Sequence, residues 1–186
     1  RYPPQFIHAE SADVALKILK DEKIDLVISM LSTGHIDTFE LAHHIKDTYP
    51  NIPIVVLTPF SREVSMKLEK EDLSAIDYVF CWLGDADLLL AIIKLLEDRM
   101  NVAHDVENVG VQTILLVEDS VRFTSSYLPN IYKIILQQSI EFKEEGANEH
   151  ESMLLKRGRP KILLAKNYDD AIILYERYKN YMLLVI

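Results

Sequence analysis

Short apolar runs alternate with amphipathic stretches along the first hundred residues. Runs of strand length predict β-strands at 6–9, 24–30, 52–58 and 76–82. Amphipathic patterns predict a helix that begins near Ser11 or Asp13 and a helix at 85–100 with Asp85 as cap. A helix is also expected at 38–49, where Pro50 marks its end, and a polar helix at 61–70. Strands alternating with helices favour a parallel sheet, so residues 5–102 are expected to form a doubly wound α/β sheet with helices on both faces.

A second α/β pattern follows a polar stretch, 103–112, which is interpreted as a linker. The expected elements are a strand at 113–117, a helix to about Phe142, a strand at 161–165, a helix at 168–179 and a strand at 182–186. Residues 143–160 are polar and charged and are expected to be a long loop or insertion. The stretch Lys156-Arg157-Gly158-Arg159 could meet a phosphate, but a solvated loop is the expected structure.

An internal repeat links the two patterns. Residues 9–16 (AESADVAL) parallel residues 165–172 (AKNYDDAI), and Leu-Val-Ile at 26–28 parallels the same triplet at 184–186. The repeat predicts two related units, 1–102 and 113–186, joined by the linker. The first begins at its second strand and the second ends on its third, so the sequence is interpreted as a piece of a longer protein.

Composition narrows the classes of function. The 29 acidic and 20 basic residues give a net charge of −9, which disfavours sequence-independent nucleic-acid binding. The longest apolar runs are too short to span a bilayer, so no membrane partner is expected. The single cysteine, Cys81, fits a reducing cytoplasm. The spacing of the five glycines excludes both GxGxxG and a P-loop.

The run Ile24–Met30 and the residues that follow it resemble the third strand and loop of response-regulator receiver domains. In that family the strand ends in the aspartate that accepts a phosphoryl group, and Met30 stands in this place. Cys81 stands where the family carries the lysine that pairs with phosphate. A thioether offers no carboxylate and little affinity for Mg²⁺, and a thiol offers no cation. The resemblance implies that the first unit is a degenerate pseudo-receiver without a cofactor.

Two further residues of the first unit match receiver positions. Thr58 falls on the hydroxyl residue that bonds a phosphoryl oxygen, and Tyr78 on the aromatic switch. Each has a structural alternative. Thr58 could bond the backbone at the end of its strand, and Tyr78 could be a core tyrosine.

The second unit carries an acidic pair after its first strand. Residues 114–120 (ILLVEDS) resemble the first strand of active receivers, whose adjacent acids hold magnesium, so Glu118 and Asp119 are candidate metal ligands. The alternative is that Asp119 or Ser120 caps the next helix. The phosphoacceptor of this unit would lie beyond Ile186, so a magnesium site would be incomplete within this sequence.

The resemblance implies a bacterial two-component signalling module of tandem receiver-like domains. The first unit would not be phosphorylated and would act through contacts with other protein domains of the same polypeptide, with a homodimer as a further option. One alternative is a phosphorelay receiver whose second unit is phosphorylated on an aspartate beyond the chain end. Another is the regulatory segment of a larger phosphoenolpyruvate-synthase-like enzyme. The fragment itself is not expected to be an enzyme, because no nucleophile and base converge in its sequence.

In the receiver fold the first strand lies between the second and the third. Residues 5–102 would therefore leave a gap in their sheet, and a strand upstream of residue 1 is expected to fill it. The alternative is strand exchange, in which residues 113–117 of the same or another copy enter the gap.

Overall fold

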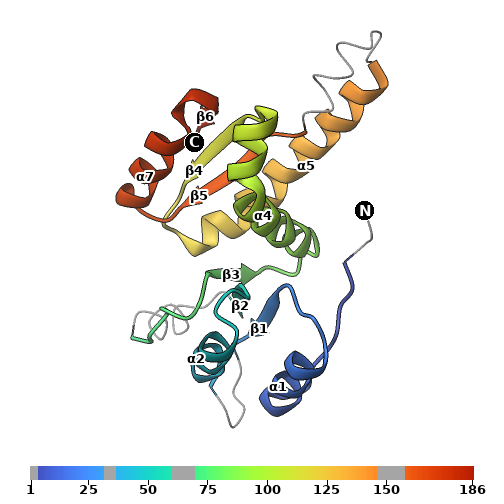
Figure 1. Cartoon of the computed structure of the whole chain (residues 1–186), viewed down its shortest axis with the longest axis vertical. Coiled ribbons are helices and arrows are strands. Elements are labelled where there is room, and N and C mark those ends of the chain that lie inside the picture. Colours follow the sequence, from blue (N-terminus) through green and yellow to red (C-terminus); the bar gives the residue numbers. More distant parts are fainter. Residues whose placement is uncertain (1–3, 32–36, 60–69, 146–157) are drawn as a thin grey trace. The chain divides into compact units, whose positions relative to one another are not determined.

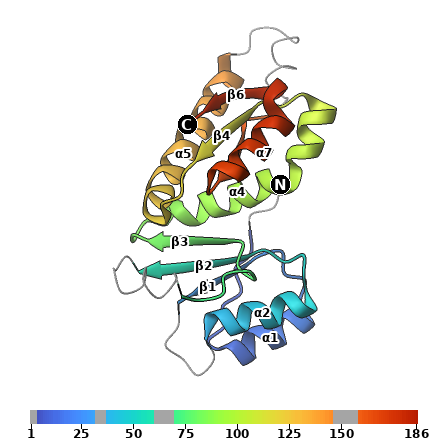
Figure 2. The same ribbon diagram turned by 90° about the vertical axis from the view of Figure 1, so that its left-hand side faces the viewer.

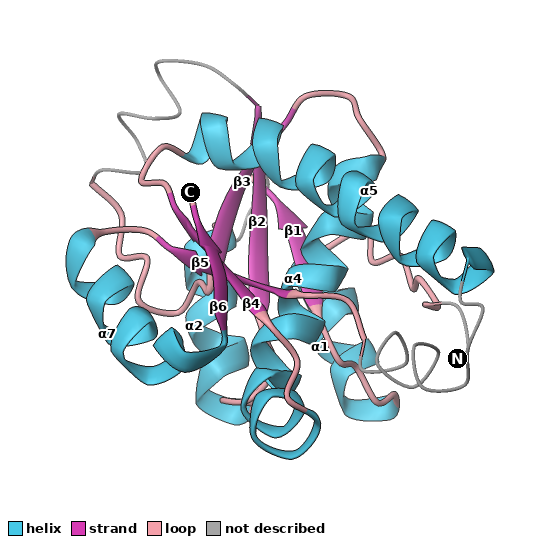
Figure 3. Cartoon of the chain, turned by 90° about the horizontal axis from the view of Figure 1, so that it is seen from above, coloured by secondary structure: helices cyan, strands magenta, loops and turns pink. Residues whose placement is uncertain are grey.

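The computed structural model describes residues 4–31, 37–59, 70–145 and 158–186 of the chain. It contains two compact units, Arg1–Trp82 and Leu83–Ile186. Each unit holds a three-stranded sheet in which all strands are parallel (Figure 1). Figure 3 distinguishes the helices from the strands by colour. The α/β class expected from the alternating pattern is confirmed.

The first unit forms a sheet with the order β1-β2-β3. Its elements are α1 (Ala12–Asp21), β1 (Val27–Met30), α2 (Thr38–Thr48), β2 (Ile54–Pro59) and β3 (Tyr78–Trp82). Helices α1 and α2 lie on one face of the sheet (Figure 2). The predicted helix at 61–70 lies outside the described residues, except for its last position.

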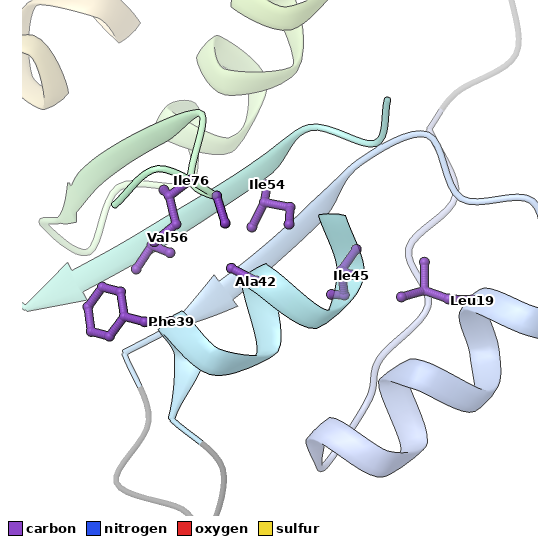
Figure 4. Close-up of a cluster of buried hydrophobic side chains, with 8 residues drawn as sticks. Leu19, Phe39, Ala42, Ile45, Ile54, Val56 and Ile76 are labelled. Carbon is purple, nitrogen blue, oxygen red and sulfur yellow. The ribbon is translucent and has the colours of Figure 1, made fainter. Parts of the chain in front are cut away.

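The core of the first unit lies between these two helices and the sheet. Its members are the buried side chains of Leu19, Phe39, Ala42, Ile45, Ile54, Val56, Ala75 and Ile76 (Figure 4). Val55 and Leu57 alternate with Ile54 and Val56 along β2 and are buried as well. Successive side chains of a strand point to opposite faces, so the unbroken apolar run of β2 corresponds to burial on both of its faces.

Residues 4–9 do not form a strand, contrary to the prediction for 6–9. The side chains of Phe6 and Ile7 are 69% and 54% exposed. Among the described residues, β1 pairs only with β2, so its other edge has no strand beside it. An extended segment becomes a strand only when a neighbour takes up its backbone hydrogen bonds, and residues 4–9 lack such a neighbour.

The second unit forms a sheet with the order β5-β4-β6. Its elements are α4 (Asp87–His104), the π-helical turn η1 (Asp105–Val109), β4 (Thr113–Val117), α5 (Val121–Glu145), β5 (Lys161–Ala165), α7 (Tyr168–Tyr178), the 3₁₀ turn η2 (Lys179–Tyr181) and β6 (Met182–Val185). Helix α7 packs on β4 and β5 from one side and α5 lies on the other side (Figure 1). Helix α4 packs against β5 and α5. Because β4 pairs with β5 and β6, it does not enter the sheet of the first unit.

The stretch 103–112 is not a linker. Helix α4 runs to His104 and continues into η1, and Val102, Val106 and Val111 are buried. Gly110, with φ +71°, ends the helical stretch in a left-handed conformation that favours glycine. The valines recur at intervals of four and five residues, which keeps an apolar side facing the core although most of their neighbours are polar. Helix α4, which was expected to belong to the unit 1–102, therefore packs as part of the second unit.

Candidate functional site

Three side chains that the receiver resemblance singles out lie at one edge of the first sheet. Met30 ends β1, Thr58 lies near the end of β2 and Cys81 near the end of β3. The strands are parallel, and their register places Met30 opposite Leu57 and Thr58 opposite Cys81. The carboxyl ends of parallel strands form the edge at which α/β sheets bind ligands.

Met30 presents its side chain to solvent at this edge. The side chain is 57% exposed, whereas the backbone around it is held in place. Thr38, the first residue of α2, donates a hydrogen bond from Oγ1 to the Met30 carbonyl oxygen at 3.0 Å, and the Leu31 N–H donates to the Leu57 carbonyl at 3.0 Å. Position 30 is thus fixed by both β2 and α2, and a thioether occupies it.

Thr58 and Cys81 form the buried part of the same edge. Thr58 is 1% exposed, and its Oγ1 donates to the Phe80 carbonyl oxygen at 3.4 Å. The same oxygen lies 3.9 Å from the Cys81 sulfur. This hydroxyl therefore makes the backbone hydrogen bond that was its structural alternative. Tyr78 is buried, with its ring stacked on Phe80 at a centroid distance of 6.1 Å, as in a core tyrosine.

The edge therefore combines a thioether, a hydroxyl and a thiol. Hard cations such as Mg²⁺ prefer oxygen ligands, above all carboxylates, and none of these three groups is a carboxylate. No cationic side chain stands at position 81 to neutralise a phosphoryl group. Among the described residues, no group of three or more histidine, cysteine, aspartate or glutamate side chains is arranged to hold a metal ion.

The acidic pair of the second unit follows its central strand, β4. Glu118 accepts a hydrogen bond from the Ser120 N–H at 2.9 Å, and the Ser120 hydroxyl accepts one from the Phe123 N–H at 3.4 Å. These contacts cap the start of α5, so the structural alternative for this segment is present. Asp119 is exposed. Two neighbouring carboxylates suit Mg²⁺ but supply only part of the oxygen set that the ion prefers.

Among the described residues, four charged side chains gather elsewhere in the second unit, around Asp98 of α4. The Asp98 side chain is fully buried and accepts both ends of the Arg159 guanidinium at 2.8 Å. It also accepts the Tyr132 hydroxyl at 2.9 Å and the Ile162 N–H at 3.0 Å. Lys161 lies 3.7 Å from Asp98 and pairs with Asp105 at 2.7 Å. We call these residues the Asp98 network.

Two positive and two negative side chains balance within the Asp98 network. Burial opposes the charge of Arg159, but its hydrogen bonds to Asp98 and the negative charge of that carboxylate outweigh burial and raise its pKa. The hydrogen bond from Lys161 lowers the pKa of Asp105. The Arg159 guanidinium also lies 5.1 Å from the centre of the Tyr132 ring, within range of a cation–π contact.

The Asp98 network joins three segments of the chain, the helical stretch of α4 and η1, helix α5 and residues 159–162, and has a structural role. It ties α4 to α5 through Tyr132 and to the outer edge of β5 through the Ile162 N–H. Arg159 was expected to be a solvated loop residue, yet its side chain is only 12% exposed. One sequence signal could have indicated the network. Asp98 follows Leu95 by three residues and precedes Val102 by four, so it lies on the buried face of α4, where an acid requires a partner.

Comparison of the chain with protein-family models, with curated proteins and with solved structures finds no significant match. Within the described residues, every helix is too short or too polar to cross a membrane.

Proposed function

We propose that the chain is a regulatory module of two receiver-like units, and that the first unit acts through protein contacts because it cannot accept a phosphoryl group. The observation that carries the proposal is the sheet edge formed by Met30, Thr58 and Cys81. In-line attack on a phosphoryl donor requires a nucleophile with a metal and a cation to neutralise charge. The thioether at position 30 and the thiol at position 81 provide neither the carboxylate nor the cation.

The strand orders support the receiver-like part of the proposal. In the flavodoxin-like class the order is 2-1-3-4-5. The order β5-β4-β6 fits strands 2-1-3 of such a sheet, with β4 as the first strand. The order β1-β2-β3 fits strands 3-4-5. The internal repeat gives the same alignment, because it matches residues 9–16 with residues 165–172.

Binding of Mg²⁺ and of beryllofluoride, a phosphoryl mimic, tests the first unit. Trp82 is the only tryptophan of the chain and directly follows Cys81, so its fluorescence reports on this edge. We expect no change on titration with either ligand and no added phosphate by intact mass after incubation with acetyl phosphate. The matched control is the double variant Glu118→Gln/Asp119→Asn, which removes any contribution of the acidic pair. A fluorescence change that persists in this control and is abolished by Met30→Ala would overturn the proposal.

A second candidate is a phosphorelay receiver in which the second unit carries the chemistry. It is favoured by Glu118 and Asp119, which follow the central strand β4. Strand β6 pairs with β4 and runs parallel to it. The test is incubation of a chain extended beyond Ile186 with acetyl phosphate and Mg²⁺. Absence of phosphoryl label on the protein after an acid quench would exclude this candidate. Label that is lost in the Asp119→Asn variant would favour it over a purely contact-based role.

A further inference from the structure

Helix α5 presents an apolar stripe to solvent. Phe123, Tyr127 and Ile134 lie four and seven residues apart, so they share one side of the helix. Their side chains are 46%, 45% and 54% exposed, and the rings of Phe123 and Tyr127 stack at a centroid distance of 5.7 Å. The opposite side of α5, with Leu128 and Tyr132, is buried. The stripe is therefore a surface of the second unit and not part of its core.

The charges beside this stripe are all positive. Between residues 121 and 139, α5 carries Arg122 and Lys133 and no acidic residue, although acids outnumber bases 29 to 20 in the whole chain. Both cations are exposed, and their spacing of eleven residues, about three helical turns, places them along one border of the stripe. The Arg122 guanidinium lies 6.0 Å from the centre of the Phe123 ring. We call this surface, formed by Arg122, Phe123, Tyr127, Lys133 and Ile134, the α5 face.

Helix α7 lies on the other side of the same sheet (Figure 1). Asn167 caps it by accepting the Asp170 N–H at 2.8 Å, and its side chains Ala171 and Tyr178 pack in the core of the second unit. The sheet therefore separates the exposed side of α7 from the α5 face within one copy of the chain.

The exposed side of α7 carries the opposite charge. From Tyr168 to Tyr178 the helix contains three acids and one base, a net charge of −2. Asp169, Ile173 and Glu176 are exposed and lie four and three residues apart, on the side away from the core. Ile173 is 65% exposed and its neighbour Ile172 is 41% exposed. We call the surface formed by Asp169, Ile172, Ile173 and Glu176 the α7 face.

We propose that the α5 face of one copy of the chain binds the α7 face of a second copy. Each face combines exposed apolar side chains with charges, as protein interfaces do, and the net charges of +2 and −2 attract each other. Pairing of two α5 faces would instead bring Arg122 and Lys133 against the same cations. Pairing of two α7 faces would oppose acids to acids, so charge favours the mixed contact over either symmetric one.

A contact between two different faces leaves one face of each kind open at the ends of a dimer. Further copies then add head to tail, and the assembly grows until a ring closes or continues as a filament. The inference concerns the second unit alone. It stands whether or not the first unit accepts a phosphoryl group.

The test measures mass against concentration. In sedimentation equilibrium of the whole chain, up to about 1 mM so that even weak contacts are populated, we expect the average mass to depend on concentration. The mass should rise from the 21.4 kDa of one copy to more than twice that value.

Two variants each remove one face. Tyr127→Glu places an acid in the α5 face, and Ile172→Ser/Ile173→Ser removes the apolar groups of the α7 face. The three side chains are exposed, so the circular dichroism spectrum and the melting temperature should stay unchanged. Each variant alone should keep the mass of one copy. An equimolar mixture should form a dimer and nothing larger, because the serine variant retains its α5 face and Tyr127→Glu retains its α7 face.

A charge reversal tests the electrostatic part of the contact. Arg122→Glu should weaken association at least about tenfold, because it sets an acid against Asp169 and Glu176. The matched control is Lys20→Glu, which makes the same change of charge at an exposed position of α1 and should leave association unchanged.

The outcomes separate the alternatives. A chain that keeps the mass of one copy at every concentration would overturn the proposal. Association of the serine variant as strong as that of the unchanged chain, with loss only in Tyr127→Glu, would show a contact between two α5 faces and would also overturn it. A mixture of the two variants that stays monomeric, while the unchanged chain associates, would exclude the contact between the α5 and α7 faces.

Discussion

Replacement of Asp98 by asparagine is expected to destabilise the second unit strongly. The Asp98 carboxylate is fully buried and accepts hydrogen bonds from Tyr132, from both ends of Arg159 and from the Ile162 N–H. Asparagine preserves the shape but removes the negative charge. It also replaces one carboxylate oxygen by an NH₂ group. This donor would face another donor, from Arg159, Tyr132 or the Ile162 N–H.

The magnitude follows from the burial of the pair. Removal of one partner of a buried ion pair costs about 3–5 kcal/mol, because the other charge stays buried without compensation. Asparagine still accepts some of the hydrogen bonds, so we expect the lower end, about 3 kcal/mol. For a domain of roughly 100 residues, this loss corresponds to a fall in the melting temperature of more than about 10 °C.

The assay combines urea unfolding with hydrogen exchange at Ile162, whose amide donates to Asp98. Hydrogen exchange at this amide, which lies in β5, reports the unfolding of the second unit independently of the first. Glu97→Gln is the matched control, because Glu97 neighbours Asp98 but pairs with Lys94 from a side chain that is 38% exposed. Such a partly exposed pair between side chains three residues apart on a helix contributes less than about 1 kcal/mol.

A loss in Asp98→Asn no larger than that in Glu97→Gln would refute the reasoning. The double variant Asp98→Leu/Arg159→Met provides a second check. It removes both charges of the Asp98–Arg159 pair, so it should be more stable than Asp98→Leu alone. If the two substitutions only add their separate losses, charge compensation between Asp98 and Arg159 is not what stabilises the network.

Three other predictions concern separate features. Met30→Asp alone should gain no phosphate from acetyl phosphate by intact mass, since one carboxylate does not supply the metal ligands and cation that the reaction requires, and a phosphorylated variant would contradict this account. The hydrogen bond from Lys161 lowers the pKa of Asp105 below its usual 3.8 in the folded protein. The Lys161–Asp105 pair therefore stabilises the fold fully above that pH, and this stabilisation is lost as the pH falls through the pKa of Asp105 in the folded state. Asp105→Asn should therefore weaken the pH dependence of urea unfolding below about pH 4, and an unchanged dependence would count against the pair. Ser11→Ala and Asn167→Ala should each cost about 1 kcal/mol of unfolding free energy, and losses of only a few tenths in both would contradict their role as helix caps.

Central strands, which have a neighbouring strand on each edge within their own unit, could be predicted from the sequence. β2 and β4 are unbroken apolar runs, and in the structure they are central strands with neighbours on both edges. The cap of α1 was predicted as Ser11 or Asp13, and the structure uses Ser11. Residues 6–9 have an equally apolar start but do not form a strand. The apolar pattern reports on side chains, whereas a strand also depends on a backbone partner that the pattern does not reveal.

Long-range partners account for the other differences. Asp98 and Arg159 are 61 residues apart, and nothing local to Arg159 indicates a buried carboxylate beside it. This contact is one of those that link α4 to the second unit, although α4 follows the last strand of the first. The alignment of Met30, Thr58 and Cys81 along one edge could be anticipated, because parallel strands bring their carboxyl ends together. The role of the Thr58 hydroxyl could not be decided from the sequence. Its hydrogen bond to the Phe80 carbonyl oxygen is visible only in the structure.

The distance along the chain between α4 and its partners affects the order in which the protein can fold during synthesis. The strands of the first unit, up to Trp82, leave the ribosome before α4, but Arg159 follows Asp98 only after 61 further residues. At about 5–20 residues per second, this separation amounts to about 3–12 s. Throughout that interval α4, a helix with several buried apolar residues, lacks its contacts with β5. We expect the buried side of this nascent helix to be accessible to chaperones until β5 has emerged.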